Sequence, residues 1–182
     1  MDLGLKNKRV LVTGASRGIG ESIAQGFLKE GAKVCIVSRG SKKLFQTEKL
    51  LVKEFGRSQV ISCVCDCTDP IALAKLKKTI LNEWDRLDVL VTNVGDGRSV
   101  NDAIPNETQW GTVWKNNFDS TINSARAFLS ILQDSKGCLL FISSIAGMES
   151  IGAPVDYSTA KTAIISLAKN LSKKVATDVR VN

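Results

Sequence analysis

The sequence predicts an α/β fold in which one domain holds a doubly wound parallel sheet between two layers of helices. Short apolar runs rich in β-branched residues alternate with longer amphipathic stretches along the 182 residues, as expected for repeated strand–helix units. A glycine-rich turn joins the first apolar run to the first amphipathic stretch. The longest polar loop, residues 95–107, follows the fourth apolar run, at the edge where open parallel sheets bind ligands.

The apolar runs predict six strands, and the periodic stretches predict five helices. Gly31 is expected to end the first helix and Ser41 to cap the second. Asp69 followed by Pro70 fits the N-cap and first residue of the third. With no repeat and no interdomain linker, one domain spanning residues 1–182 is expected. The strands are predicted at residues 9–13, 33–37, 60–65, 89–92, 138–142 and 179–182, and the helices at 19–30, 42–55, 71–84, 108–133 and 155–176.

Composition and charge predict an ordinary globular protein. Hydrophobic residues make up 43% of the chain and charged residues 24%, within the usual range. No apolar run approaches the length of a membrane span, and no long apolar stretch precedes the N-terminal charges, so we expect no membrane partner, no signal peptide and a cytoplasmic location. The net charge of +7 is scattered along predicted helices, which predicts a solvated basic surface and no nucleic-acid partner.

The five cysteines and the lack of histidine exclude two kinds of chemistry. Cys63, Cys65 and Cys67 alternate along a predicted strand and therefore point to one face, where neighbours two residues apart are poorly placed for a disulfide. No C-x-x-C pair occurs, so no metal site is predicted. Without histidine, a Ser-His-Asp hydrolase is excluded.

The first glycine-rich turn has the chemistry of a phosphate site. Gly14, Gly18 and Gly20 are spaced as G-x-x-x-G-x-G between a predicted strand and a predicted helix. Glycines permit a tight turn and a close approach of backbone to phosphate. The helix N-terminus offers unpaired N–H groups and a positive dipole end. The turn is therefore predicted to bind a dinucleotide pyrophosphate, together with Ser16, Arg17 and Ile19.

A second group of residues predicts acid–base chemistry. Tyr157, the only tyrosine, and Lys161 are four residues apart in a predicted helix, so they share one face. An ammonium beside a phenol lowers the phenol's pKa and makes a proton donor and acceptor usable near neutral pH. Ser144 lies 13 positions before Tyr157, where an apolar run breaks into a loop. Ser143 competes with Ser144 for the same role.

These motifs, in this order, resemble the short-chain dehydrogenase/reductase family, and the resemblance covers nearly the whole chain. It implies a Rossmann-type fold and a nicotinamide cofactor. The matching pieces are Thr13-Gly14-x-x-x-Gly18-Ile19-Gly20, Asp66 in Cys65-Asp66-Cys67-Thr68-Asp69, Thr92-Asn93-Val94-Gly95, Asn117, Ser144 and Tyr157-x-x-x-Lys161.

The resemblance also implies the role of each residue. Ser144 polarises the substrate oxygen, Tyr157 transfers the proton, Lys161 assists the tyrosine and binds the nicotinamide ribose, and Asn117 holds a water that links Lys161 to solvent. Asn116 precedes Asn117 and is the other residue considered for this position. The dinucleotide is further expected to contact Asp66, Cys67, Asn93, Val94 and Gly95, as well as Tyr157 and Lys161.

The end of the second predicted strand favours NADP(H) over NAD(H). Relatives that bind NAD carry an acidic residue there, whereas this chain has Ser38 followed by Arg39. A carboxylate would repel a 2′-phosphate, and arginine pairs with phosphate through two hydrogen bonds. Arg17 is expected to reach the same phosphate. Arg98 is considered as a contact for an anionic or sugar-like substrate, with a solvated loop arginine as the alternative.

The nearest subgroup by resemblance is the 3-oxoacyl-acyl-carrier-protein reductases, which implies a ketone or secondary alcohol as substrate, whether free or linked to a carrier. A reductase of a sugar or another polar ketone, and a non-catalytic dinucleotide-binding scaffold or fragment, are the alternatives. The chain stops inside a predicted strand, so the family's last strand and substrate lid are expected to be missing. A homodimer through the helices at 108–133 and 155–176 is expected, and a tetramer for a longer form.

Overall fold

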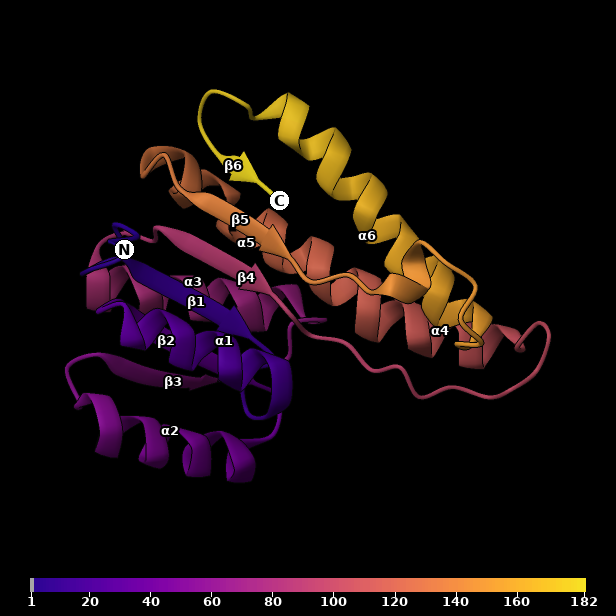
Figure 1. Cartoon of the computed structure of the whole chain (residues 1–182), viewed down its shortest axis with the longest axis horizontal. Coiled ribbons are helices and arrows are strands. Elements are labelled where there is room, and N and C mark those ends of the chain that lie inside the picture. Colours follow the sequence, from indigo (N-terminus) through magenta and orange to yellow (C-terminus); the bar gives the residue numbers. More distant parts are fainter. Residues whose placement is uncertain (1) are drawn as a thin grey trace.

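Six parallel strands form one twisted sheet in the computed structural model, which describes residues 2–182 (Figure 1). The spatial order is β3-β2-β1-β4-β5-β6, so the strand order reverses between β1 and β4, where this fold binds its ligands. The predicted doubly wound parallel fold is confirmed. The strands are β1 (Arg9–Thr13), β2 (Lys33–Ser38), β3 (Val60–Val64), β4 (Val89–Thr92), β5 (Cys138–Phe141) and β6 (Arg180–Val181).

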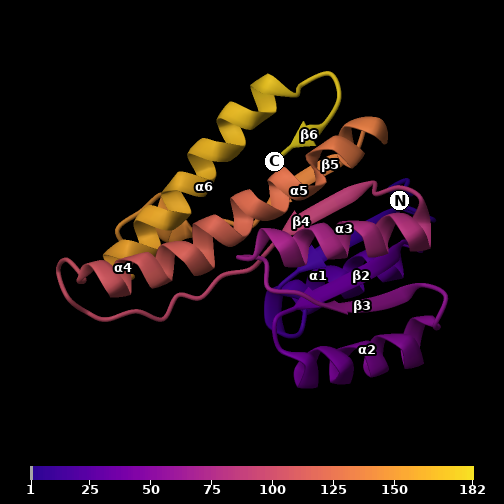
Figure 2. The same cartoon turned by 180° about the vertical axis from the view of Figure 1, so that it is seen from behind.

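Helices cover both faces of the sheet because side chains alternate along each strand. Val10 and Val12 of β1 pack in a core with α1 and α2, whereas Leu11 packs in a second core with α3, α5 and α6. Figures 1 and 2 show α1 and α3 on opposite sides of the sheet. The helices are α1 (Gly18–Lys29), α2 (Ser41–Phe55), α3 (Pro70–Trp84), α4 (Glu107–Trp114), α5 (Ser120–Asp134) and α6 (Val155–Lys174), with a short 3₁₀ turn, η2 (Ile145–Gly147).

Local chemistry sets most helix ends as predicted. The Asp69 side chain accepts a hydrogen bond from the Ile71 N–H at the start of α3, with Pro70 as the first helical residue. Gly31 follows α1 with φ of +78°, a conformation that favours glycine. The expected Ser41 cap is wrong. Ser41 is already the first residue of α2, and the N-cap is Gly40, which makes no side-chain bond.

The predicted helix at 108–133 is interrupted. Between α4 and α5 lies one π-helical turn, η1 (Lys115–Asp119). The Asn117 Nδ2 donates to the carbonyl oxygen of Val113, four residues earlier, at 2.9 Å, and thereby satisfies a backbone acceptor inside the widened helix. Such turns are frequent at functional sites, and asparagine's poor helix propensity is explained here by its bonds.

The strand of cysteines ends sooner than expected. β3 stops at Val64, so Cys65 and Cys67 lie beyond it, although the Cys65 N–H still bonds the Ser38 carbonyl at 3.1 Å. All three cysteines nevertheless pack in or against the same core, on the side of α3. Other ends shift by one or two residues. α6 ends at Lys174, β5 at Phe141, and β6 spans only two residues.

Candidate active site and dinucleotide groove

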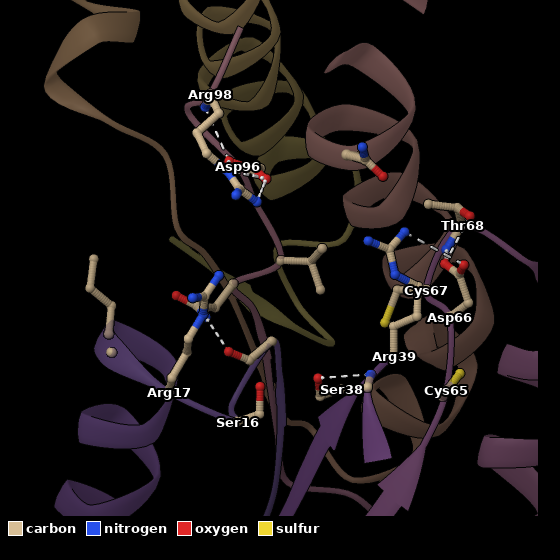
Figure 3. Close-up of a pocket in the computed structure, with 18 residues that line it drawn as sticks. Ser16, Arg17, Ser38, Arg39, Cys65, Asp66, Cys67, Thr68, Asp96 and Arg98 are labelled. Atoms are coloured by element: carbon tan, nitrogen blue, oxygen red, sulfur yellow. Dashed lines mark hydrogen bonds and ion pairs between the residues drawn. The ribbon is translucent and has the colours of Figure 1, made fainter. Parts of the chain in front are cut away.

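A cavity of about 570 Å³ opens at the carboxyl ends of the central strands. It is lined by every predicted dinucleotide residue outside α6 except Gly20, and additionally by Gly40, Cys65, Thr68, Asp96, Arg98 and Asn116 (Figure 3). The lining therefore draws on five separate segments: the turn after β1, the ends of β2, β3 and β4, and the η1 turn that holds Asn116. The predicted residues in it are Gly14, Ser16, Arg17, Gly18, Ile19, Ser38, Arg39, Asp66, Cys67, Asn93, Val94 and Gly95.

The turn after β1 is shaped by its glycines. Gly14 has φ of +65° and Gly18 of +59°, in the left-handed region that other residues rarely adopt. A Cβ on Gly20 would lie 2.5 Å from the Asn93 Nδ2 and 2.5 Å from the Gly14 carbonyl oxygen. Gly20 is therefore a packing glycine behind the groove. The Asn93 amide in turn donates to the carbonyls of Thr13 and Gly14, each at 3.2 Å.

One end of the groove is formed by Arg39 and Asp66. Their side chains are 4.0 Å apart, and the Asp66 carboxylate also accepts hydrogen bonds from the Thr68 N–H at 2.9 Å and hydroxyl at 2.8 Å. Burial acts to raise the pKa of Asp66, but the Thr68 bonds and the nearby Arg39 outweigh it and lower the pKa. The carboxylate is therefore ionised at neutral pH and holds Arg39 at the groove.

Arg17 lies on a different side of the pocket from Arg39 (Figure 3). Its charge acts on Asp96, whose pKa is lowered first by the hydrogen bonds from Arg98. Asp96 and Arg98 form an ion pair at 2.6 Å. The structure thus places Arg17 and Arg39 on different sides of one pocket, and it pairs Arg98 with a carboxylate. That both arginines reach one phosphate stays a prediction.

The two thiols that line the groove, Cys65 and Cys67, belong to free cysteines. Each residue is 4% exposed. The neighbouring Cys67 thiol, together with burial, raises the pKa of the Cys65 thiol. This thiol therefore stays protonated and uncharged at the groove.

Tyr157 and Lys161 lie on one face of α6, as the spacing predicts. The Lys161 Nζ is 5.8 Å from the centroid of the Tyr157 ring and donates to the Ile142 carbonyl oxygen at 3.0 Å. Lys161 is only 3% exposed, and burial lowers its pKa from 10.5 to about 8. The ammonium is therefore close to losing its proton under mildly alkaline conditions.

The two competing serines make different bonds. The Ser143 hydroxyl donates to the Lys161 backbone carbonyl at 2.8 Å. The Ser144 oxygen accepts from the Ala146 N–H at 3.2 Å and caps η2. Within residues 2–182 the Ser144 hydroxyl donates no hydrogen bond, whereas that of Ser143 is already used. This difference favours Ser144 as the donor to a substrate oxygen.

Asn117 lies near Lys161, and Asn116 lines the groove. The Asn117 side chain is fully buried; it accepts from the Asp96 N–H at 3.1 Å and donates to the Asp96 carbonyl at 3.0 Å. A Cβ on Gly95 would lie 3.0 Å from the Asn117 Oδ1 and 3.0 Å from the Lys161 Nζ. Asn117 in the π turn thus brings together the loop after β4, the end of α4 and Lys161 of α6.

Sequence reasoning missed two residues beside Tyr157. The Asp156 side chain is fully buried and accepts from the Tyr157 N–H at 2.8 Å and from the Ser99 hydroxyl at 2.5 Å. The only sequence clue to Asp156 is that it directly precedes Tyr157. Nothing in the sequence indicates that its carboxylate is buried or that Ser99 reaches it.

The fold and the site define a dinucleotide-dependent oxidoreductase of the α/β type, and comparison with known proteins agrees. The model of the short chain dehydrogenase family matches residues 8–182. The chain therefore belongs to the short chain dehydrogenase/reductase family, and the predicted resemblance is confirmed. Among the described residues, 2–182, no helix is both long and apolar enough to cross a membrane.

The proteins similar to this chain include several oxidoreductases. It is 34% identical to the Bacillus subtilis oxidoreductase YvrD, over 100% of this chain and 68% of that protein. It is 33% identical to the 3-oxoacyl-[acyl-carrier-protein] reductase FabG of Chlamydia trachomatis, over 98% and 72%. L-sorbose reductase of Gluconobacter frateurii, solved with NADPH and L-sorbose, superposes with a TM-score of 0.93 at 27% identity, covering 100% of this chain and 70% of that one.

Proposed function

We propose that this protein is an NADP(H)-dependent reductase that interconverts a ketone and a secondary alcohol. The observation that carries the proposal is one arrangement in the structure. A buried Lys161 lies beside Tyr157 on one helix face, and Ser144 has an uncommitted hydroxyl. These are the groups that a proton transfer to a carbonyl oxygen requires. NADP(H), when bound, supplies the hydride.

The residues present fit a dinucleotide. The glycine turn after β1 brings backbone to the edge of the cavity at the N-terminus of α1, and its left-handed glycines leave room for a pyrophosphate. Asp66 at the other end offers an ionised acceptor for the adenine. Asn93 and Gly95 would hold the nicotinamide end, where a Cβ on Gly95 would make tight contacts of 3.0 Å with the Lys161 Nζ and the Asn117 Oδ1.

The protein's own residues provide the proton path. The Ser144 hydroxyl donates to the substrate oxygen and orients it. Tyr157 gives its phenolic proton to that oxygen during reduction and removes a proton during oxidation. Lys161, held by the Ile142 carbonyl, has a pKa of about 8, so it can accept and return protons near neutral pH. Asn117 holds the loop after β4 against Lys161.

A Tyr157→Phe variant tests the mechanism. Reduction of ketones by the variant should fall by roughly a thousandfold or more, because phenylalanine keeps the ring and removes the transferable proton. NADPH affinity should stay within about twofold, since the hydroxyl is one contact among many. The measurement is NADPH oxidation with a panel that includes an acetoacetyl thioester and L-sorbose. A variant that retains most of its turnover would remove Tyr157 from the mechanism.

Preference for NADP(H) rests on Ser38 and Arg39 at the end of β2. The Arg39 guanidinium is already at the groove and 4.0 Å from Asp66, and a charge-assisted bond to a 2′-phosphate is worth about 1.5–3 kcal/mol. Arg39→Asp should therefore weaken NADPH binding roughly tenfold to a hundredfold and leave NADH binding nearly unchanged. Fluorescence titration of both cofactors is the measurement. Equal or tighter binding of NADH by the unaltered chain would contradict the preference.

The relatives support a proposal for the substrate class. FabG of Chlamydia trachomatis is named as a 3-oxoacyl-carrier-protein reductase, so we propose a 3-oxoacyl substrate or a similar ketone. A sugar ketone is the second candidate, supported by the superposition on L-sorbose reductase. Comparing kcat/KM for an acetoacetyl thioester and for L-sorbose decides between them. Turnover of neither would favour a dinucleotide-binding scaffold.

A further inference from the structure

Asp156 is a fully buried carboxylate that the proposed mechanism does not use. It lies in the first turn of α6, directly before Tyr157, and is 0% exposed. None of the ion pairs within residues 2–182 includes it. Two hydrogen bonds offset the cost of burying this carboxylate: it accepts one from the Tyr157 N–H at 2.8 Å and one from the Ser99 hydroxyl at 2.5 Å. The positive end of the helix also stabilises it. A buried carboxylate is tolerated only when it is bonded in this way.

Ser99 belongs to the long loop between β4 and α4, which is the extended coil beyond β4 in Figure 1. This loop is fixed at two points. At its start, Asp96 exchanges two backbone hydrogen bonds with the Asn117 side chain. Three residues later, Ser99 bonds Asp156. The short segment 96–99 is therefore tied to η1 at one end and to α6 at the other.

Between these two ties the segment crosses the catalytic ring. A Cβ on Gly97 would lie in ordinary contact with the Tyr157 ring, 3.6 Å from its Cζ and 3.7 Å from its Cε2, so Gly97 faces the phenol with space for one methyl group between them. The Tyr157 side chain is only partly buried. The segment at Gly97 therefore passes over the ring, near the carbon that carries the hydroxyl.

We infer that Ser99 and Asp156 are positioning residues for Tyr157, since their hydrogen bond holds the segment 96–99 across the ring. The inference rests on the proposed role of Tyr157. The bond fixes where the phenol points and how much water reaches it. Neither Ser99 nor Asp156 lines the groove, and Asp96, which does, is held separately by the Asn117 side chain. Loss of the bond should therefore slow the reaction and expose the ring, while cofactor binding is preserved.

The test compares Ser99→Ala with Ser99→Thr, which keeps the hydroxyl, and with Ser58→Ala, an exposed serine before β3. Because Tyr157 is the only tyrosine, its nitration by tetranitromethane reports on one ring, located by peptide mass. In Ser99→Ala, nitration should be roughly threefold faster or more. Both control variants should react like the unaltered chain. Equal nitration rates in Ser99→Ala and the unaltered chain would overturn the inference, whether or not turnover is detected.

Kinetics supply the second readout. In Ser99→Ala, kcat should fall roughly tenfold, with KM and the Kd for NADPH within about twofold of the unaltered values. Ser99→Thr should restore kcat. In a double-mutant cycle with Asp156→Asn, the combined loss should be no larger than the greater single loss, and additive losses would contradict a shared bond. If Asp156→Asn does not fold, as judged by circular dichroism, the comparison of Ser99→Ala with Ser99→Thr still decides.

The two proposals fail in different ways. If Tyr157→Phe retains turnover, the proposed mechanism is wrong. If Tyr157→Phe abolishes turnover but Ser99→Ala changes neither kcat nor nitration, the mechanism stands and the positioning role of Ser99 and Asp156 is refuted.

Discussion

The burial of Lys161 should make stability rise with pH over an alkaline range. Its side chain is 3% exposed, and burial lowers its pKa from 10.5 to about 8. Between these two values the unfolded chain binds more protons than the folded chain. The free energy of unfolding therefore increases with pH there, and the destabilising effect of the charged lysine is complete below about pH 8.

The size of this effect follows from the pKa shift. At neutral pH Lys161 is protonated in both the folded and the unfolded chain. Burial of the charged form then costs about 3 kcal/mol, because each unit by which the pKa is lowered corresponds to about 1.36 kcal/mol. Raising the pH from 7 to 10 should recover about 2.5 kcal/mol of this cost. Lys161→Met removes the titrating group and fills the site with a flexible apolar chain. Relative to this variant, the unaltered chain should thus gain about 2.5 kcal/mol between pH 7 and pH 10.

Urea unfolding followed by circular dichroism, at pH 7, 8, 9 and 10 without cofactor, measures this gain. Taking the difference between the free energies of unfolding of the two chains removes the contribution of all titrating groups that they share. The absolute difference at pH 7 also contains the lost hydrogen bond to Ile142, so only its change with pH is used. Lys169→Met, an exposed position on the same helix, should show no such change. A pH-independent difference for Lys161→Met would refute the reasoning.

Two further predictions concern the floor of the site and assembly. Gly95→Ala should lower turnover and NADPH affinity, because its Cβ would lie 3.0 Å from both the Lys161 Nζ and the Asn117 Oδ1; kinetics and fluorescence titration check this, and full activity would contradict it. The chain should form a homodimer through α4–α5 and α6, so light scattering should give twice the mass of one chain, whereas a monomeric mass would contradict the assembly.

Local and periodic features of the sequence were enough for the fold. The alternation of apolar runs and amphipathic stretches predicted the order of elements, since strand and helix periods differ. The cap at Asp69 with Pro70, and the end of α1 at Gly31, followed from bonds made within a few residues. The spacing shared with the family located the glycine turn, Tyr157 and Lys161, because each of these motifs lies within one turn or one helix.

Features that depend on contacts between distant segments were decided by the tertiary structure. The π turn at Asn117 depends on a loop 21 residues earlier in the chain. The placement of Arg17 and Arg39 on different sides of one pocket, and the pairing of Arg39 with Asp66, depend on where the turn after β1 and the ends of β2 and β3 meet in space.

The bond between Ser99 and Asp156 joins residues 57 positions apart. No pattern of residue types marks it, because the pairing of two polar side chains depends on how the loop after β4 is routed over α6. The sequence by itself therefore determined the fold, the glycine turn and the placement of Tyr157 and Lys161 on one helix face. Only the packed structure decided which polar groups hold them in place, since those hydrogen bonds form only after the sheet and helices bring distant segments together.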